Sequence, residues 1–570
     1  MLGLSPLSAQ EPPRAADSLP SREQVQQPAP ASTVNPASTA RVDASKVIRS
    51  APCPLETSSA RVTLTSVRYR SPAEKPVVGS IARALAGVGV ETQGEQPVKA
   101  VCAIRDRANA ALRKAGYIAS VQIPPQTITT GELLLTVVTA RITEVRVHGE
   151  PGHYRDTLLT RIAKLRALDP VNEHDAERIL LIAGDLPGLD VQLSLRPAGT
   201  TPGAVIGDLT IVRRRFTMLA NVQNYGSRQL GRETVYVRAE TYGLLTPSDV
   251  VYVGASTTRQ LREQQVAQAG YITGVGGNGA TVGIRANYAW SRPDLGQLDL
   301  RSRSLIAGLD LSLPLIRTVP ANLTIGGGAE AIEQRTRVYG GGVSTPLNRD
   351  KLRVVFLRLG GNARLRALDG RDIFTFAGGL ELRKGLGLLG ATKEGEISSA
   401  SGYTPSRFGA DPQAFVVRGS GAATAHLRPL SISSEARIQW TNKPLLNFEE
   451  FSVGNLSIGR GYDPGSNSAD RAAGLANEAR FDLPFLPTLP IQLFGFGDIV
   501  WLRNLDEGTT ERRRTLRSVG GGARVTLPGR LLLEVTYAKP LDRALTFDDK
   551  PPPARVLASL TAQFAPQVRP

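Results

Sequence analysis

The stretch ATVGIRANYAW, residues 280–290, carries the clearest signal for the fold. Apolar side chains occupy every second position, and small or polar side chains occupy the positions between them. The apolar set is Val282, Ile284, Ala286, Tyr288 and Trp290, and the other set is Thr281, Gly283, Arg285 and Asn287. Because successive side chains of a β-strand point to opposite faces, this stretch predicts a strand with one apolar and one polar face.

The same alternation continues from about residue 213 to the end of the chain. Roughly 16 such segments are separated by Gly, Asn, Asp and Pro, and helical periodicity disappears. No run approaches about 18 consecutive apolar residues, which excludes a transmembrane helix, but a membrane strand needs only about ten residues. Residues 213–570 therefore predict a transmembrane antiparallel β-barrel of about 16 strands. A string of soluble β-sandwiches, with shorter strands, is the alternative.

The charge pattern argues against nucleic acid as a partner. The chain has 570 residues and a net charge of +17, but its Lys and Arg residues are scattered, and only 213–215 and 512–514 form short arginine runs. No basic helix or aromatic RNA-binding motif accompanies them. The glycine-rich GVGGNG at 274–279 is followed by a strand, whereas a dinucleotide site requires a helix, so it is interpreted as a hairpin turn.

Two cysteines, Cys53 and Cys102, are present. In an exported protein this pair predicts one disulfide, whereas in a cytosolic protein the two residues would be incidental. The four histidines lack zinc-ligand spacing, and no Ser-His-Asp or Cys-His set is evident. We expect no catalytic residue, no metal and no cofactor, and the chain is not predicted to be an enzyme.

Residues 1–59 are expected to be a leader and a linker. MLGLSPLSAQ, residues 1–10, resembles the end of a signal peptide that lacks its charged region and most of its apolar region. Residues 10–55 are rich in Pro, Ala, Ser and Gln and cannot bury a core. Within them, residues 18–27 predict a short helix capped by Ser21.

Residues 60–141 and 142–212 each predict a small α+β domain. In the first, a strand precedes a helix that ends at Gly116, and two strands follow. In the second, an opening strand precedes two helices, the later one capped by Asn172, and two strands close the domain.

These two domains resemble the periplasmic POTRA domains of two-partner secretion transporters, the TpsB proteins of the ShlB/FhaC/HecB type. The first resemblance rests on ALRKAGYIASVQIPPQTITTGELLLTV and the second on DPVNEHDAERILLIAGDLPG. The signature positions are Gly116, Tyr117, Pro125 and Gly131 in the first domain and Pro187 and Gly188 in the second. A barrel follows in the family's order, so the resemblance runs from about residue 60 to the end.

The resemblance also implies a loop that folds back into the barrel lumen. Its tip motif matches Arg460, Gly461 and Tyr462, with Gly459 where the family has an apolar residue. The partner motif on the barrel wall matches Phe496 and Asp498.

Counting by twos along IQLFGFGDIVW, residues 491–501, places Asp498 on the inward, polar face of its strand. We therefore expect an ion pair between Arg460 and Asp498, with Phe496 or Tyr462 stacked on the arginine.

The resemblance further implies a place in the cell. The barrel would lie in the outer membrane of a Gram-negative bacterium, with the POTRA domains in the periplasm. A disulfide between Cys53 and Cys102 would tie the linker to the first POTRA domain, and residues 18–27 would plug the pore. Phe564 would be the terminal aromatic residue of the barrel, although six residues follow it.

The function implied is secretion of a partner protein. We expect a monomer that contacts outer-membrane lipid and transports an unfolded, TpsA-like exoprotein, such as a haemolysin or an adhesin. Its POTRA domains would bind the partner through their sheet edges or through a groove between a helix and a strand. An outer-membrane protein assembly insertase of the same superfamily and a passive porin are the alternatives, and a soluble β-rich adhesin is a third.

Overall fold

The computed structural model describes residues 20–26, 42–43, 52–53, 55–90, 94–199, 201–367, 371–395, 402–483, 489–506 and 509–568. The signal-peptide remnant expected at 1–10 lies outside them. The chain divides into two compact units, each described here by itself. The barrel unit comprises residues 1–36, 216–316 and 320–566, and the α+β unit comprises residues 37–215, 317–319 and 567–570.

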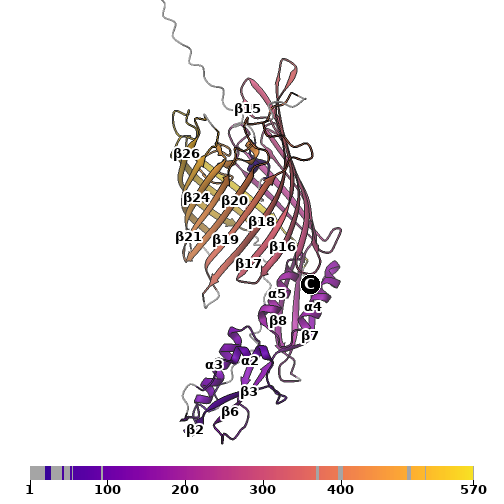
Figure 1. The fold of residues 1–570 in the computed structure, drawn as a ribbon, viewed down its shortest axis with the longest axis vertical. Coiled ribbons are helices and arrows are strands. Elements are labelled where there is room, and N and C mark those ends of the chain that lie inside the picture. The colour runs from indigo at the N-terminus through magenta and orange to yellow at the C-terminus, as the bar shows by residue number, and fades with distance from the viewer. Residues whose placement is uncertain are drawn as a thin grey trace, which may run out of the picture. The chain divides into compact units, whose positions relative to one another are not determined.

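The barrel unit is a closed antiparallel β-barrel (Figure 1). Its described residues form 16 strands, the predicted number, and the barrel closes where β28 pairs with β10. The strands are β10 (Phe216–Gln223), β11 (Thr234–Tyr242), β12 (Asp249–Thr258), β13 (Gln264–Val275), β14 (Ala280–Ser291), β16 (Leu298–Arg317), β17 (Ala321–Gly340), β18 (Val343–Arg366), β19 (Asp372–Gly385), β20 (Phe415–Leu427), β21 (Leu430–Thr441), β24 (Arg471–Asp482), β25 (Ile491–Arg503), β26 (Arg513–Leu527), β27 (Leu531–Pro540) and β28 (Arg555–Phe564). The two-residue strand β15 (Asp294–Leu295) extends the loop between β14 and β16.

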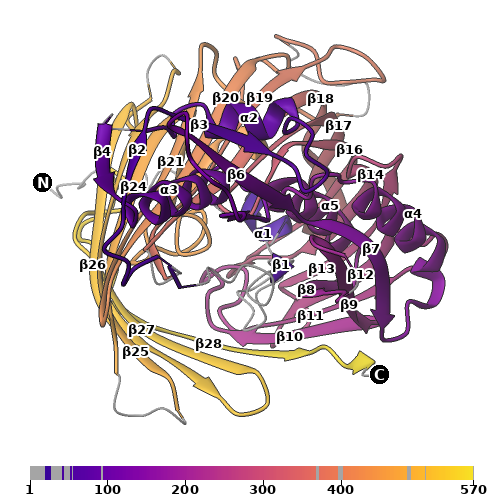
Figure 2. The same ribbon diagram turned by 90° about the horizontal axis from the view of Figure 1, so that it is seen from below.

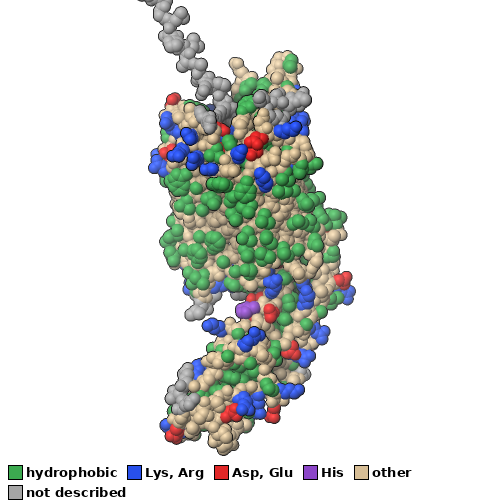
Figure 3. All heavy atoms as spheres, viewed as in Figure 1, with side chains coloured by type: hydrophobic (Ala, Val, Ile, Leu, Met, Phe, Trp, Pro, Cys, Tyr) green, Lys and Arg blue, Asp and Glu red, His purple; other side chains and the backbone are tan. Residues whose placement is uncertain are grey.

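Alternation along each strand separates the two faces of the wall. On β25, Trp501 is 46% exposed, whereas its neighbours Val500 and Leu502 are buried. On the face shown in Figure 3, apolar side chains form a band across the middle of the barrel, and charged side chains gather beyond its upper edge. Such a band is what a barrel presents to lipid hydrocarbon.

The two ends of the barrel differ. At the end where the chain enters β10, short turns join the strands, and residues 276–279 form the expected hairpin turn between β13 and β14. At the opposite end the connections are longer, as at 442–470 and 541–554. We call these the turn end and the loop end.

The α+β unit begins with a domain on a three-stranded sheet of order β3-β6-β5. Its elements are β2 (Arg61–Leu64), β3 (Ser66–Arg70), α2 (Gly79–Leu85), β4 (Gly94–Pro97), α3 (Ala100–Lys114), β5 (Ala119–Gln122) and β6 (Glu132–Thr139). The stretch 61–70, interpreted as one strand, is two strands in different sheets, because the N–H groups of Thr65 and Ser66 both donate to the Gly131 carbonyl. Helix α2 was not predicted.

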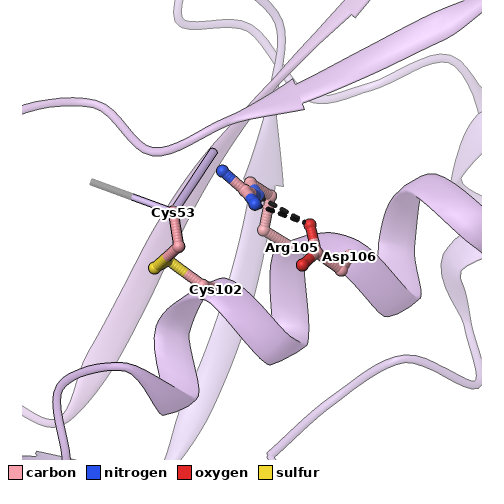
Figure 4. The surroundings of a disulfide bond; sticks show 4 residues. All are labelled: Cys53, Cys102, Arg105 and Asp106. Carbon is pink, nitrogen blue, oxygen red and sulfur yellow. Dashed lines mark hydrogen bonds and ion pairs between the residues drawn. A yellow bond between two sulfur atoms is a disulfide. The ribbon is translucent and has the colours of Figure 1, made fainter. Parts of the chain in front are cut away.

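A disulfide joins Cys53 to Cys102 on helix α3 (Figure 4). The two cysteines are 49 positions apart, and closing a loop of that length stabilises a fold by roughly 4 kcal/mol in the chain-entropy model. The bond fixes the segment before the first domain to that domain's longest helix.

The second domain of the α+β unit has a sheet of order β1-β8-β9-β29, and β7 also pairs with β9. Its elements are β1 (Val42–Asp43), β7 (Arg141–His148), η2 (Gly152–Tyr154), α4 (Arg155–Arg166), α5 (Glu173–Gly184), β8 (Leu189–Pro197), β9 (Ala204–Arg214) and β29 (Gln567–Val568). Asn172 caps α5 by accepting from the His174 N–H at 2.9 Å, as the sequence predicts. Strand β9 continues to Arg214, so the barrel begins at Phe216.

The expected signature residues lie at turns and domain junctions. Gly116, with φ of +80°, follows α3, and a Cβ there would lie 2.5 Å from the His174 ring of the second domain. Gly131 and Gly188 also have positive φ. Tyr117 packs on the first core, Pro125 follows β5, and the Pro187 carbonyl accepts from the Tyr154 hydroxyl.

Candidate functional site

Residues 442–470 connect β21 and β24, and we call them the lumen loop. The loop carries η3 (Asn447–Glu449) and a small hairpin of β22 (Phe451–Val453) and β23 (Asn467–Ala469). Its tip, between the hairpin strands, turns at Gly454 and Gly459, whose φ angles are +151° and +99°. Val453 and Tyr462 have no exposed surface, because the tip packs against the inner wall of the barrel.

Arg460 at the loop tip is ion-paired with Asp498 on β25. Its Nη2 lies 2.7 Å from Asp498 Oδ1, and its backbone N–H donates to Oδ2 at 2.8 Å. The Asp498 side chain is completely buried, and Ser518 also donates to it at 3.3 Å. The guanidinium lies 3.7 Å from the ring centroid of Phe496, so the expected stacking partner is Phe496.

Two further charged residues complete this cluster, and sequence reasoning missed both. Glu478 on β24 accepts from Arg460 Nη1 at 2.5 Å and pairs with Arg524 on β26 at 2.6 Å. Arg524 lies 4.1 Å above the ring of Phe494. The available signal was that Glu478 shares the inward face of its strand, but only the register places Glu478 opposite Phe496.

Gly461 and Tyr462 fix the tip by contact and hydrogen bonding. A Cβ on Gly461 would lie 2.8 Å from both the Pro540 nitrogen and the Ser518 Cβ, so only glycine permits this approach. The Tyr462 hydroxyl lies 2.9 Å from the Arg517 carbonyl oxygen and accepts from the Asp542 N–H at 3.2 Å. Tyr462 therefore anchors the loop to the wall without stacking on Arg460.

Helix α1 (Arg22–Val25) also lies inside the barrel, where Figure 2 shows it within the ring of strands. Ser21 caps it in a capping box with Gln24, as expected. Val25 is fully buried in a cluster with wall residues such as Ile306 and with Phe448 of the lumen loop. The Gln334 side chain of β17 donates to the Pro20 carbonyl at 3.3 Å.

Arg22 joins α1 to a second buried cluster. It pairs with Glu330 of β17 at 2.7 Å and with Glu449 of the lumen loop at 2.8 Å. Arg383 of β19 reaches the same two carboxylates at 2.7 and 2.8 Å, and Arg418 of β20 reaches Glu449 at 3.0 Å. Glu449 of the lumen loop thus binds both the helix, through Arg22, and the wall, through Arg383 and Arg418.

A cavity of about 1180 Å³ lies in the lumen beside α1. Its wall comes from β16 to β21, with charged side chains such as Arg358, Glu381 and Arg437. Glycines, which have no side chains to fill the lumen, also line this wall: Gly326, Gly327, Gly360, Gly361, Gly378, Gly379, Gly419 and Gly421. The lumen therefore combines an open polar space with two segments that occupy it, the helix and the loop.

Chemical features beyond ion pairing are few in the described part of the chain. No group of three or more metal-ligand side chains occurs there. Within the same residues, no helix is long and apolar enough to cross a membrane. Phe564 ends β28, is exposed on the outer face, and has its ring 5.8 Å from that of Phe216.

Comparison with known proteins gives a consistent result. The family model "Haemolysin secretion/activation protein ShlB/FhaC/HecB" matches residues 211–525. The heme/hemopexin transporter protein HuxB of Haemophilus influenzae is 22% identical over 454 residues, 76% of either chain. CdiB from Escherichia coli matches with a TM-score of 0.65 and 17% identity over 90% of this chain and 93% of that one. CdiB from Acinetobacter baumannii gives 0.60 and 16% over 95% of each. At such identities the structural matches establish the fold.

Proposed function

This chain belongs to the haemolysin secretion/activation family ShlB/FhaC/HecB, and on that premise we propose that it secretes one dedicated exoprotein through its barrel. Membership makes it an outer-membrane β-barrel of the two-partner secretion type. The observation that carries the proposal is a lumen occupied by two segments, α1 and the lumen loop, which contact each other and the wall beside an open polar cavity.

The α+β domains are the proposed receptor for the unfolded partner. In the first domain, β3 and β5 border their sheet among the described strands, and in the second β7 pairs on one side only. A bordering strand presents unpaired N–H and C=O groups to which an extended chain can add as a further strand. Such binding uses backbone groups, so it tolerates the varied side chains of a long exoprotein.

Helix α1 is the segment that would leave the lumen to open the route. Without Arg22, Glu449 keeps Arg383 and Arg418, and Glu330 keeps Arg383. When the helix departs, both buried carboxylates therefore keep an arginine partner. The free-energy penalty for an unpaired buried charge does not arise. The partner would then move along the glycine-lined cavity wall, driven by its own folding outside the cell.

The cargo is proposed to be a TpsA-like exoprotein, either a haemolysin or an adhesin. HuxB is named as a heme/hemopexin transporter, so an exoprotein that acts on a haem carrier is a further candidate class. We propose that the transporter works as a monomer surrounded by outer-membrane lipid.

The test compares the exported proteins of cells with and without this chain, complemented by wild type, by Arg460→Ala and by Arg366→Ala. Arg366 pairs with Asp372 at the turn end, away from the lumen loop, and serves as the control. We expect one large protein to vanish from the exterior without the chain and to return with wild type and Arg366→Ala only. A parallel decline of many outer-membrane proteins would favour an insertase. Unchanged exported proteins with altered solute uptake would favour a porin.

A further inference from the structure

Three arginines stand side by side on adjacent barrel strands at the loop end. Arg471 begins β24, Arg503 ends β25 and Arg513 begins β26. In the strand register Arg471 lies opposite Arg503, and Arg503 lies opposite Arg513. Residues opposite each other on neighbouring strands share a face of the sheet. We call these residues the arginine row.

The arginine row faces outward, at the edge of the apolar band. Trp501, two residues before Arg503 on the same face, is 46% exposed, and Trp440 on β21 is 47% exposed. The Arg471 guanidinium lies 5.4 Å from the Trp440 ring centroid. Tryptophans in this position mark the boundary between lipid hydrocarbon and polar headgroups. In Figure 3, Lys and Arg side chains gather above the band, over the strands labelled β24 and β26 in Figure 1.

The row has no carboxylate partner among the residues that the structure describes. Arg471 donates to the Thr441 carbonyl at 2.6 Å, and no ion pair involves Arg471, Arg503 or Arg513 in that part of the chain. Arg301, another outward arginine of the loop end, is paired with Asp299 at 2.8 Å. Like charges opposite one another destabilise a sheet, so binding of an anion would relieve the repulsion within the row.

We propose that the arginine row binds the phosphate groups of an anionic lipid in the outer leaflet. A guanidinium presents two parallel N–H groups that match phosphate oxygens. The row spans two strand spacings, about 10 Å, which accommodates a headgroup with two phosphates. The acyl chains lie on the apolar band directly below the tryptophans. A soluble anion would gain nothing from that band, so the position of the row selects a lipid.

The experiment uses the full chain in nanodiscs of phosphatidylcholine containing a small fraction of a diphosphorylated glycolipid. Retained glycolipid is measured by native mass spectrometry, with the dephosphorylated form of the same glycolipid as reference. The test variant is Arg471→Gln, Arg503→Gln, Arg513→Gln. The control is Arg292→Gln, Arg301→Gln, Arg349→Gln, which removes the same charge from arginines already paired with Asp299 or Glu333. Heat-modifiable migration in gels confirms that each barrel has closed.

We expect the test variant to bind the diphosphorylated glycolipid at least about tenfold more weakly, while the control stays near wild type. A variant with three Arg→Lys changes keeps the charge and should recover part of the affinity. Equal losses in test and control variants, or no preference for the phosphorylated form, would overturn the proposal. So would full displacement by the same concentration of inorganic phosphate. Capture of an exported protein by the row in pure phosphatidylcholine would assign it to a protein partner instead.

Discussion

Two buried clusters of ion pairs hold the contents of the barrel lumen, and they differ in how many partners each carboxylate has. In the first, Asp498 has one arginine among the described residues, Arg460, which belongs to the lumen loop. In the second, Glu449 has three arginines, of which only Arg22 belongs to helix α1. The loop tip thus has a partner that cannot be replaced, whereas the helix shares its partners with the wall.

From this difference we infer which segment leaves the barrel lumen during transport. If the loop tip withdraws, Asp498 keeps only the Ser518 hydroxyl, and a buried charge left without its partner is strongly destabilising. If α1 withdraws, Glu449 and Glu330 both remain paired with Arg383. We therefore expect α1 to leave during transport while the loop tip stays docked.

Loss of Arg460 should have the largest effect. In Arg460→Ala, Asp498 loses its guanidinium, at a cost of about 3 kcal/mol. That corresponds to a docked population lower by about 100-fold, so export of the partner should fall below detection in an immunoblot of the medium.

The charge-reversed pair is the matched control for that change. Arg460→Asp combined with Asp498→Arg should recover part of the export that either single change removes, although Glu478 limits the recovery. Export at the wild-type level by Arg460→Ala would show that the docked tip is not required.

A methyl group on Gly461 should have the next largest effect. The new Cβ would meet backbone and side-chain atoms of β26 and β27 at 2.8 Å, and overpacking of this kind costs about 1–3 kcal/mol. Export by Gly461→Ala should fall several-fold while the barrel still closes. Gly497→Ala, where a Cβ meets nothing within 4 Å, should export normally. Equal export by both variants would contradict a close fit of the tip.

Neutralising Glu449 tests the shared carboxylate. Glu449→Gln replaces charge-assisted hydrogen bonds to three arginines with neutral ones, a loss of about 2 kcal/mol. We expect α1 to be released more often, which raises single-channel conductance in planar bilayers. Export should fall less than in Gly461→Ala, because the loss is divided between helix and loop. Unaltered conductance would mean that the pairing with Glu449 does not hold the helix.

Removal of Arg22 should have the smallest effect on export. Arg22→Gln weakens the hold on α1 by about 1 kcal/mol and leaves both carboxylates paired. Conductance should rise, while export stays within about two-fold of wild type. Glu23→Gln, on the same helix but outside the cluster, should change neither quantity. A large loss of export in Arg22→Gln would reverse the roles assigned to helix and loop.

Features that depend only on residues close together in the sequence could be predicted from the sequence. Alternation by twos places Asp498 and Phe496 on the inward face of β25, and the capping box at Ser21 predicts helix α1. The number of barrel strands is confirmed for the same reason, since each strand carries its own alternation.

Contacts between residues far apart in the sequence could not be predicted from local patterns. Glu478 completes the Arg460 cluster only through the register of β24 against β25. Arg22 and Glu330 are 308 positions apart, so the position of α1 in the lumen follows from ion pairs that no local pattern encodes. Helix α2 is only seven residues long, too short for its periodicity to identify it.

The most direct test fixes one segment at a time. Ile458→Cys with Gly474→Cys would tether the loop tip to β24, because a Cβ on Gly474 lies 2.7 Å from the Ile458 side chain. Pro20→Cys with Gln334→Cys, bridged by a short bis-thiosulfonate, would tether the segment before α1 to β17. The native cysteines are already joined to each other, so neither reaction involves them. We expect export to continue with the loop tethered, to stop with the helix tethered, and to resume after reduction. Export that stops with the loop tethered and continues with the helix tethered would contradict the account.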